Sequence, residues 1–242
     1  MRVPYWRVSR PRPSWHQSWH DLLFVHWPVP AGALRRFVPA GLTLDQYDGT
    51  AWLGLVPFRM TGVRFAGLPA VPWLSAFVEM NLRTYVTGGG KPGVLFLRMD
   101  ASRLLAVKAA RAALSLPYVW STMRVTHDGA AVEYRSRRQD AWLEARYEPI
   151  GPPAPAAPGS FEDFATERYC LYSPHRGRVL RVDIDHPRWE LQPATWQPRV
   201  NTIAQSLGLP ATPHDPHVRF ARRQDVVGWR AVEGKALTTW IA

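Results

Sequence analysis

Cysteine and lysine are scarce in this chain of 242 residues. Its single cysteine, Cys170, excludes a disulfide framework within the chain, so the fold does not depend on an oxidising compartment. A lone cysteine in an apolar run indicates packing rather than a nucleophile. Side-chain amines are confined to Lys91, Lys108 and Lys235, so almost all of the 30 basic side chains are arginines.

Acidic residues and long apolar runs are also few. The 19 Asp and Glu against 30 Lys and Arg give a net charge of +11, which raises the question of nucleic-acid binding. The arginines are dispersed along the chain, so we expect no nucleic-acid interface, and an acidic small ligand is compatible with the charge. No run approaches the roughly 18 apolar residues of a membrane span, and the first residues lack the apolar segment of a signal peptide. We therefore expect a soluble, cytoplasmic protein without a membrane partner.

Motifs for nucleotide, nucleophile and metal chemistry are missing or weak. The glycine run at 87–91 lacks the Gly-Lys-Ser/Thr ending of a phosphate loop, and neither a Gly-x-Ser-x-Gly nor a Cys-x-x-Cys motif occurs. His16 and His20 are four residues apart, which on a helix would allow a shared metal, but packing with the neighbouring tryptophans is the simpler interpretation. His214 and His217 form a second weak pair in a proline-rich segment. We expect no metal and no cofactor.

What the sequence does contain is a series of short strand-like segments. Apolar and polar residues alternate, and turn residues separate the runs, at 21–27, 50–58, 77–86, 92–100, 118–138, 140–149, 178–192 and 217–229. Helical patterns are fewer, and they fall at 32–38, 102–114, 160–169 and 201–208. We interpret the proline-rich stretch 151–159 as a surface loop within one domain spanning 1–242. The pattern predicts a mainly β protein with a few helices, organised as a barrel or a sandwich.

The segment FVEMNLRTYV, residues 77–86, has two distinct faces when it is read as a strand. One face is an ordinary core face, made by Val78, Met80, Leu82, Thr84 and Val86. The other face carries Phe77, Glu79, Asn81, Arg83 and Tyr85. The acid and the base on it are about 13–14 Å apart along an ideal strand, too far for a direct pair, so each needs another partner or a ligand. The sequence allows two environments for this face, bulk solvent or a polar-lined interior.

Five segments together resemble the YqjF-like family of uncharacterised bacterial proteins. They are FVHWPVPAGALRRFVPAGLTLD (24–45), VEMNLRTYV (78–86), KPGVLFLRMDA (91–101), LPYVWSTM (116–123) and ERYCLYS (167–173). The similarity extends over nearly the whole chain. More distantly, the family is similar to the acetoacetate-decarboxylase-like superfamily. That resemblance implies an α+β fold built on a cone-shaped antiparallel β-barrel, with a ligand cavity inside the barrel.

The superfamily resemblance also implies positions for a site. Glu79 falls on a strand position that carries a functional glutamate in the decarboxylases. Arg111 and Pro117 fall on an arginine and a proline of the segment that carries the catalytic lysine. Tyr118 then occupies the position of the lysine that forms the Schiff base, and Gly54 lies near a second acidic position.

Because Tyr118 stands in place of that lysine, the chemistry of the decarboxylases cannot be assumed for this chain. A phenol cannot form an imine, and Schiff-base decarboxylation needs an amine with a lowered pKa. The three lysines lie elsewhere in the sequence, so we expect no Schiff-base decarboxylase activity. Tyr118 remains suited to donating a hydrogen bond or, less easily, to acting as a general acid.

Two classes of function stay open for the sequence. One is a small-molecule-binding barrel without chemistry, for a carboxylate or carbonyl compound. The other is a lyase, hydratase or isomerase that uses Tyr118 and Glu79 as proton donor and acceptor. In either case we expect the ligand to contact Asn81, Arg83, Tyr85, Arg111, Trp27 and His26. Arg168, Tyr169 and Tyr172, at the expected end of the helix at 160–169, would cover the mouth of the barrel or bind an anion there. A homo-oligomer also stays open.

Overall fold

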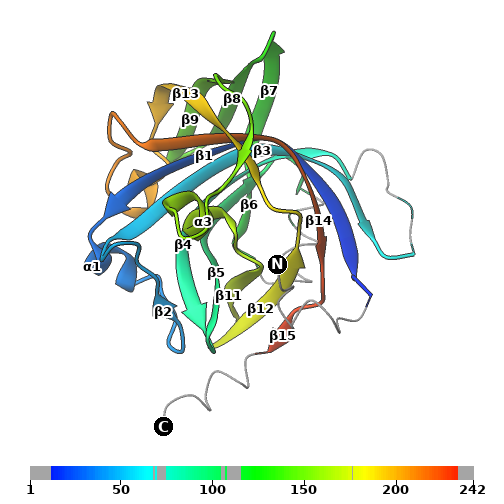
Figure 1. Cartoon of the computed structure of the whole chain (residues 1–242), viewed down its shortest axis with the longest axis vertical. Coiled ribbons are helices and arrows are strands. Elements are labelled where there is room, and N and C mark those ends of the chain that lie inside the picture. Colours follow the sequence, from blue (N-terminus) through cyan, green and yellow to red (C-terminus); the bar gives the residue numbers. More distant parts are fainter. Residues whose placement is uncertain are drawn as a thin grey trace.

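A computed structural model describes residues 12–67, 69, 75–104, 107, 116–175 and 177–233 of the chain (Figure 1). The strands, in chain order, are β1 Trp15–Val29, β2 Thr43–Leu44, β3 Ala51–Phe65, β4 Phe77–Gly88, β5 Lys91–Ala101, β6 Tyr118–Trp120, β7 Thr122–Asp128, β8 Ala131–Arg138, β9 Ala141–Pro149, β10 Ala154–Pro155, β11 Cys170–His175, β12 Arg178–Asp185, β13 Glu190–Asn201, β14 His217–Gly228 and β15 Val232–Glu233. The helices are α1 Ala31–Arg35, α3 Phe161–Thr166 and the 3-10 helix η2 Gln205–Leu207.

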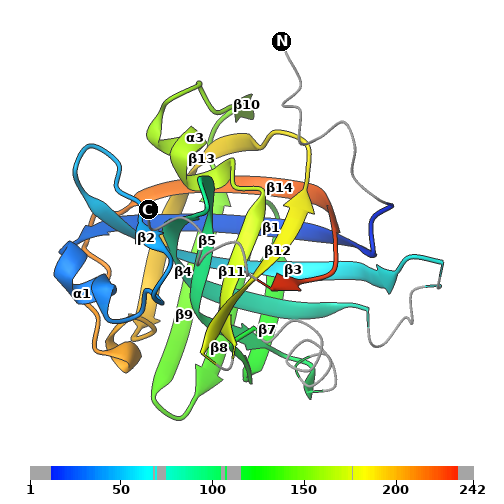
Figure 2. The ribbon, with the colours of Figure 1, turned by 90° about the horizontal axis from the view of Figure 1, so that it is seen from below.

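Seven strands form a closed ring, in the order β1, β3, β4, β5, β11, β12 and β14. The ring closes where Ile184 and Asp185 of β12 pair with Gly228 and Val227 of β14. In Figure 1 the outline of these strands encloses the short helix α3 in projection, and Figure 2 shows the helix to one side of them. The mainly β class predicted from the sequence is therefore confirmed.

The ring is a mixed sheet, so the expectation of an antiparallel barrel is only partly confirmed. Leu171 of β11 pairs in parallel with Val94 of β5, and β6 also runs parallel to β5. Parallel neighbours require long connections, because a short hairpin can only join antiparallel strands. The chain meets this requirement by building other strands between β5 and β11 before it returns to the ring.

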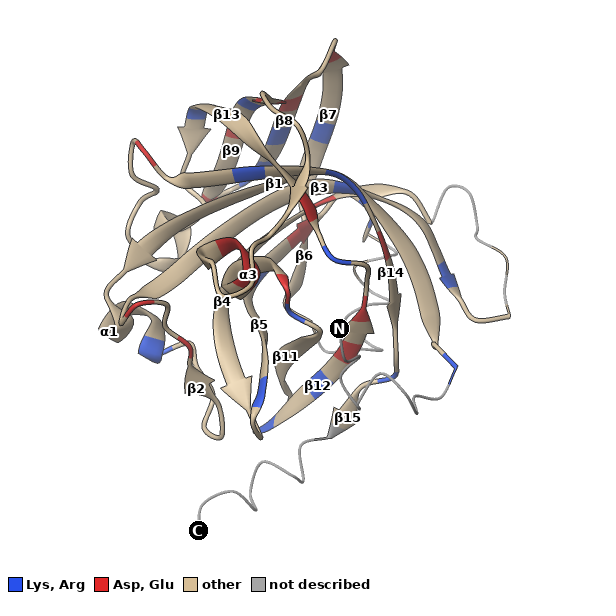
Figure 3. Ribbon diagram, in the orientation of Figure 1, with Lys and Arg blue, Asp and Glu red and all other residues tan. Residues whose placement is uncertain are grey.

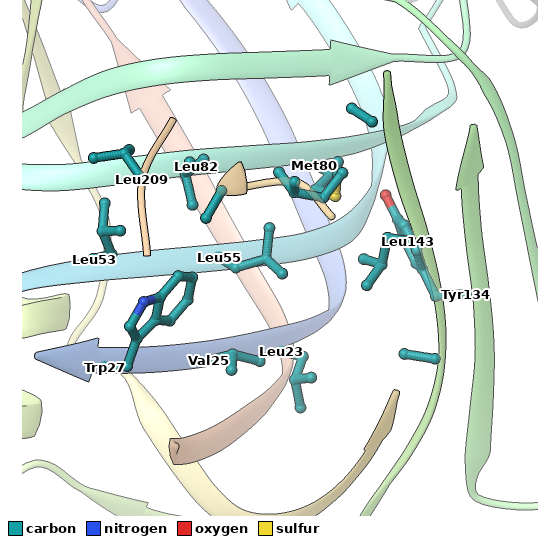
Figure 4. Close-up of a cluster of buried hydrophobic side chains, with 14 of the residues drawn as sticks. Leu23, Val25, Trp27, Leu53, Leu55, Met80, Leu82, Tyr134, Leu143 and Leu209 are labelled. Carbon is teal, nitrogen blue, oxygen red and sulfur yellow. The ribbon is translucent and has the colours of Figure 1, made fainter. Parts of the chain in front are cut away.

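A second, four-stranded sheet extends from the ring. Its strands β7, β8, β9 and β13 are antiparallel, and it joins the ring through the pairing of β13 with β14 (Figure 2). The largest apolar cluster lies between this sheet and the outer face of β1, β3 and β4. Figure 4 shows part of that cluster, which includes Leu23, Trp27, Leu55, Leu82, Tyr134 and Leu143. Burying each leucine there stabilises the fold by about 1.5–3 kcal/mol.

Most predicted strands are found, with ends shifted by a few residues. The predicted run 178–192 is interrupted at 186–189 and divides into β12 and the start of β13. The proline-rich segment 151–159 contains only the two-residue strand β10, which pairs with β13.

The helices differ more from the prediction. The segment 32–38 forms the shorter α1, and 160–169 forms α3, whose first turn is capped by the Ser160 hydroxyl accepting from the Asp163 amide. The expected helix at 201–208 is realised only in part, since Asn201 is the last residue of β13 and the helical residues that follow are those of the 3-10 helix η2. The expected helix at 102–114 lies for the most part outside the described residues.

Two expectations drawn from composition concern the distribution of basic residues and the absence of a membrane span. Figure 3 shows Lys and Arg positions spread over the ring and the four-stranded sheet. The expectation that no nucleic acid binds stays a prediction. Within the described ranges, no helix has the length and apolar character needed to cross a membrane.

Candidate functional site

The second face of the segment 77–86 is turned into the protein. Glu79 is 1% exposed and Asn81 is 5% exposed, while Phe77 and Arg83 are half-buried, so most of this face is shielded from bulk solvent. Met80 and Leu82, on the opposite face of β4, pack against the four-stranded sheet. We call the face that carries Glu79, Asn81, Arg83 and Tyr85 the inner face of the ring.

Glu79 and Tyr118 form a buried hydrogen-bonded pair on this inner face. The Tyr118 hydroxyl donates to Oε2 of Glu79 over 2.8 Å. The two residues are 39 positions apart in the chain, and they meet because β6 carries Tyr118 alongside Met99 of β5, whose own neighbour is Asn81 of β4. From the other side of the sheet, the Tyr134 hydroxyl donates to the backbone carbonyl of Glu79 over 2.7 Å and fixes the strand at this residue.

Burial keeps both members of the pair protonated. Loss of hydration raises the pKa of Glu79 from 4.5 to about 8, although the Tyr118 hydrogen bond opposes this. Burial and the nearby Glu79 carboxyl also raise the pKa of Tyr118 well above its ordinary value. At neutral pH the pair is therefore an uncharged carboxylic acid beside an uncharged phenol, and the acid has a pKa close to the operating pH of a general acid or base.

A row of four residues, three of them with polar side chains, crosses the inner face at the next inward position of β4 after Asn81. His217 of β14 lies opposite His26 of β1. His26 lies opposite Gly54 of β3, and Gly54 lies opposite Arg83 of β4. We call these four residues the polar row.

A hydrogen bond crosses the polar row above Gly54. His26 Nε2 and the Tyr85 hydroxyl are 2.6 Å apart, although their strands flank β3. A Cβ atom on Gly54 would lie 2.8 Å from His26 Nε2 and 3.2 Å from the Tyr85 hydroxyl, so the missing side chain provides the space for this contact. Burial, and then the charge of Arg83, lower the pKa of His26 well below 6.5, so the imidazole is neutral at pH 7.

Arg83 and Asn81 each have a buried polar atom without a partner among the described residues. Arg83 Nη2 donates to the Ala165 carbonyl over 3.3 Å, but its Nε makes no hydrogen bond. Asn81 Oδ1 is likewise unpartnered. Buried polar atoms in native proteins nearly always have partners, so a bound water or ligand would supply what these two atoms on neighbouring inward positions of β4 lack. The guanidinium lies 5.3 Å from the ring centre of Phe24 and 5.7 Å from that of Tyr85.

Helix α3 packs over the polar row. The Phe161 ring lies 4.1 Å from that of Trp52 and 5.4 Å from that of His26. The carboxylate of Glu162 ties the helix to β14 by a 2.7 Å ion pair with Arg219 and a 3.2 Å contact with His217. In Figure 1 the helix lies within the outline of the ring.

The structure therefore brings together most of the residues that the sequence nominated. Glu79, Tyr118, Asn81, Arg83, Tyr85 and His26 all lie on the inner face. Trp27 does not, because it follows His26 in β1 and its side chain points to the opposite face, where it packs in the outer cluster (Figure 4). Arg111 lies outside the described residues. The charge of Arg83 acts on the pKa of His26, whereas burial and Tyr118 set the pKa of Glu79.

The residues expected at the end of the helix have structural partners instead. Arg168 pairs with Asp45 over 2.6 Å. Tyr172 lies on β11 and not at a helix end, because the chain becomes a strand at Cys170, and its hydroxyl donates to the carbonyls of Gly88 and Lys91.

The structure does not arrange either of the two weak histidine pairs as a metal site. His16 and His20 lie on strand β1, where four residues span about 13–14 Å, so the helical geometry that would share a metal is wrong. His217 contacts Glu162 in the polar row. Among the residues that the structure describes, no group of three His, Cys, Asp or Glu side chains is placed to hold a metal ion.

Sequence reasoning placed Gly54 near the site through the resemblance, but it missed Phe24, Phe161 and His217 as neighbours. Phe24 follows from period two along β1 once the inner face of that strand is known. Phe161 and His217 had no such signal, because their approach depends on where α3 and β14 lie in the ring.

Sequence comparison places the chain among proteins without an assigned activity. The model of the DUF2071 family, an uncharacterised conserved protein, matches residues 16–225. The uncharacterised protein YqjF of Bacillus subtilis (strain 168) is 41% identical over 227 residues, which cover 92% of this chain and 94% of that protein.

Structural comparison shows a shared fold at low sequence identity. The enduracididine biosynthesis enzyme MppR, complexed with pyruvate, has a TM-score of 0.64 at 12% identity, covering 93% of this chain and 91% of that one. An acetoacetate decarboxylase has a TM-score of 0.63 at 14% identity, covering 92% and 90%. The acetoacetate decarboxylase of Legionella pneumophila has a TM-score of 0.62 at 10% identity, covering 97% and 93%. These neighbours have the acetoacetate-decarboxylase-like fold that the resemblance implied.

Proposed function

We propose that this chain, which belongs to the DUF2071 family, binds a small carbonyl or carboxylate compound on the inner face of its ring and moves a proton on it. The observation that carries the proposal is the buried Glu79–Tyr118 pair, in which a carboxylic acid with a pKa of about 8 accepts a hydrogen bond from a phenol. Strongly perturbed acids of this kind are concentrated at functional sites.

Each member of the pair has a distinct role in the proposed reaction. The Tyr118 hydroxyl donates a hydrogen bond to the carbonyl oxygen of the ligand. The ionised form of Glu79 removes a proton from the carbon next to that carbonyl, which leaves an enol or enolate, and the protonated form returns it. The proton removed from carbon resides on Glu79, where it exchanges with solvent before a proton is returned, and no imine is involved because no lysine occupies the matched position.

Arg83 supplies the cationic end of the proposed site. Its Nε has no partner among the described residues, and a carboxylate would satisfy it while replacing the weak 3.3 Å contact with the Ala165 carbonyl. Support for a ligand of this class comes from MppR, a protein of the same fold with pyruvate bound.

Binding without chemistry is the second candidate, and the aromatic surroundings of the polar row favour it. Phe24, Trp52, Tyr85, Phe161 and Phe164 form a connected set of ring contacts there. Ligand-binding sites are typically apolar with a few fixed polar groups, which this arrangement resembles.

Exchange of carbon-bound protons in D₂O separates the two candidates. We expect the protein to catalyse deuterium incorporation next to the carbonyl of simple oxo acids, measured by proton NMR. Glu79→Gln should abolish the exchange, and Tyr118→Phe should slow it by about 10²-fold or more, the usual scale for one proton-transfer group. The exposed Glu190→Gln is the matched control. Saturable binding without exchange would favour the second candidate, and the lack of both would refute the proposal.

A further inference from the structure

The inner face of β4 has two chemically different ends. Glu79, opposite Phe58 and Ala101, lies at one end, and Arg83, opposite Gly54 and Phe96, lies at the other. Four residues of a strand separate their Cα atoms by about 13–14 Å. The end at Glu79 offers an uncharged acid and phenol, whereas the end at Arg83 offers a cation and a neutral imidazole.

The guanidinium of Arg83 is held at its own end of the strand. It lies against the rings of Phe24 and Tyr85, and it donates to the Ala165 carbonyl of α3. Its charge acts on His26 of the polar row, while the pKa of Glu79 is set by burial and by Tyr118. The cation and the acid are therefore separate binding elements and do not form one cluster.

Between the two ends the surroundings are mostly apolar. Asn81 lies opposite Val56 of β3 and Met99 of β5. The Phe24 ring, which contacts the Arg83 guanidinium, belongs to the apolar cluster that also contains Val56 and Phe58. The unpartnered Asn81 Oδ1 is a polar atom within these apolar surroundings.

We propose that the ligand is an elongated oxo acid, in which several carbon–carbon bonds separate the carboxylate from the reacting carbonyl. The carboxylate lies on Arg83 in the polar row, the carbon chain passes Asn81 and Val56, and the carbonyl meets Glu79 and Tyr118. This inference rests on the proposed function and names the substrate class of that site.

A short oxo acid cannot make both contacts. In a 2-oxo acid the carboxylate and the carbonyl are on adjacent carbon atoms, and in a 3-oxo acid one carbon separates them. Such a ligand reaches either Arg83 or the Glu79–Tyr118 pair. A longer acid gains the charge-assisted hydrogen bonds at one end without losing the carbonyl contact at the other.

A homologous series of ligands tests the inference. Pyruvate, 4-oxopentanoate, 6-oxoheptanoate and 8-oxononanoate are compared by calorimetric titration, together with 2-octanone, which lacks the carboxylate. We expect affinity to rise at least tenfold from pyruvate to the best of the longer acids, and 2-octanone to bind at least tenfold more weakly than that acid. Arg83→Met should remove the advantage of the acid over the ketone. The exposed Arg64→Met should leave it unchanged.

The outcomes separate this inference from the proposed function. Equal affinities along the series, or tightest binding of pyruvate, would overturn the elongated ligand even if proton exchange is catalysed. An equal loss for acid and ketone in Arg83→Met would overturn the role of Arg83 as the carboxylate-binding end. If no member of the series binds and none is exchanged, both proposals fail together.

Discussion

Replacing Glu79 by glutamine should change how the stability of the protein depends on pH. Glu79 has a pKa of about 8 in the folded protein against an ordinary value of 4.5. Between these values the folded state retains a proton that the unfolded chain has released. The contribution of Glu79 to stability is therefore complete below about pH 4.5 and is lost as pH rises to 8.

The size of this effect follows from the displacement of the pKa. At about 1.4 kcal/mol per pKa unit, the change from 4.5 to about 8 corresponds to roughly 5 kcal/mol of unfolding free energy. Because Glu79 is fully buried, little of this is screened by solvent. A single proton gives a slope of at most about −1.4 kcal/mol per pH unit across that window.

The Glu79→Gln side chain does not titrate, and its carbonyl still accepts from Tyr118. We expect the variant to match the wild-type protein within about 1 kcal/mol near pH 5, the usual net worth of one hydrogen bond. It should exceed the wild type in stability by several kcal/mol near pH 8. Urea unfolding followed by tryptophan fluorescence from pH 5 to 9 measures this, with Glu190→Gln as control. Parallel pH profiles for the wild type and Glu79→Gln would mean that folding does not raise the pKa of Glu79.

Three further predictions concern Gly54, Asp100 and the absence of imine chemistry. Gly54→Ala places a Cβ 2.8 Å from His26 Nε2, so thermal unfolding should show a loss of about 1–3 kcal/mol, whereas Gly32→Ala, with no atom within 4 Å of the new Cβ, should not be destabilised. Asp100→Ala leaves the buried Arg98 without its bidentate partner, and urea unfolding should show a loss of about 3–5 kcal/mol. Borohydride treatment with acetoacetate should leave the intact mass unchanged; a reproducible adduct on any lysine would contradict the absence of imine chemistry.

Local patterns predicted much of the fold and one face of the site. Alternation in 77–86 separated the inner residues Glu79 and Arg83 from the core residues Met80 and Leu82, because side chains of a strand alternate strictly. The same rule shows why Trp27 was misplaced. Neighbouring residues of a strand cannot share a face, so accepting His26 excludes Trp27, and the sequence did not reveal which of the two faced inward.

Sequence patterns could not predict which strands pair when they are distant in the chain. The contact of Glu79 with Tyr118 was suggested by the family resemblance and not by spacing, since it depends on β6 pairing in parallel with β5. The helical pattern at 201–208 was realised only in part: Asn201 pairs with β9 as the last residue of β13, and the 3-10 helix η2 follows. The polar row joins four strands and could not be found without their register.

Infrared spectroscopy tests whether Glu79 is protonated at neutral pH, because it detects the proton on this side chain itself. A difference spectrum between the wild-type protein and Glu79→Gln at pH 7 isolates the vibrations of this one side chain. We expect the carbonyl stretch of a protonated carboxylic acid, which should disappear with a midpoint near pH 8. A carboxylate signal at pH 7, with titration near the ordinary value of 4.5, would contradict it.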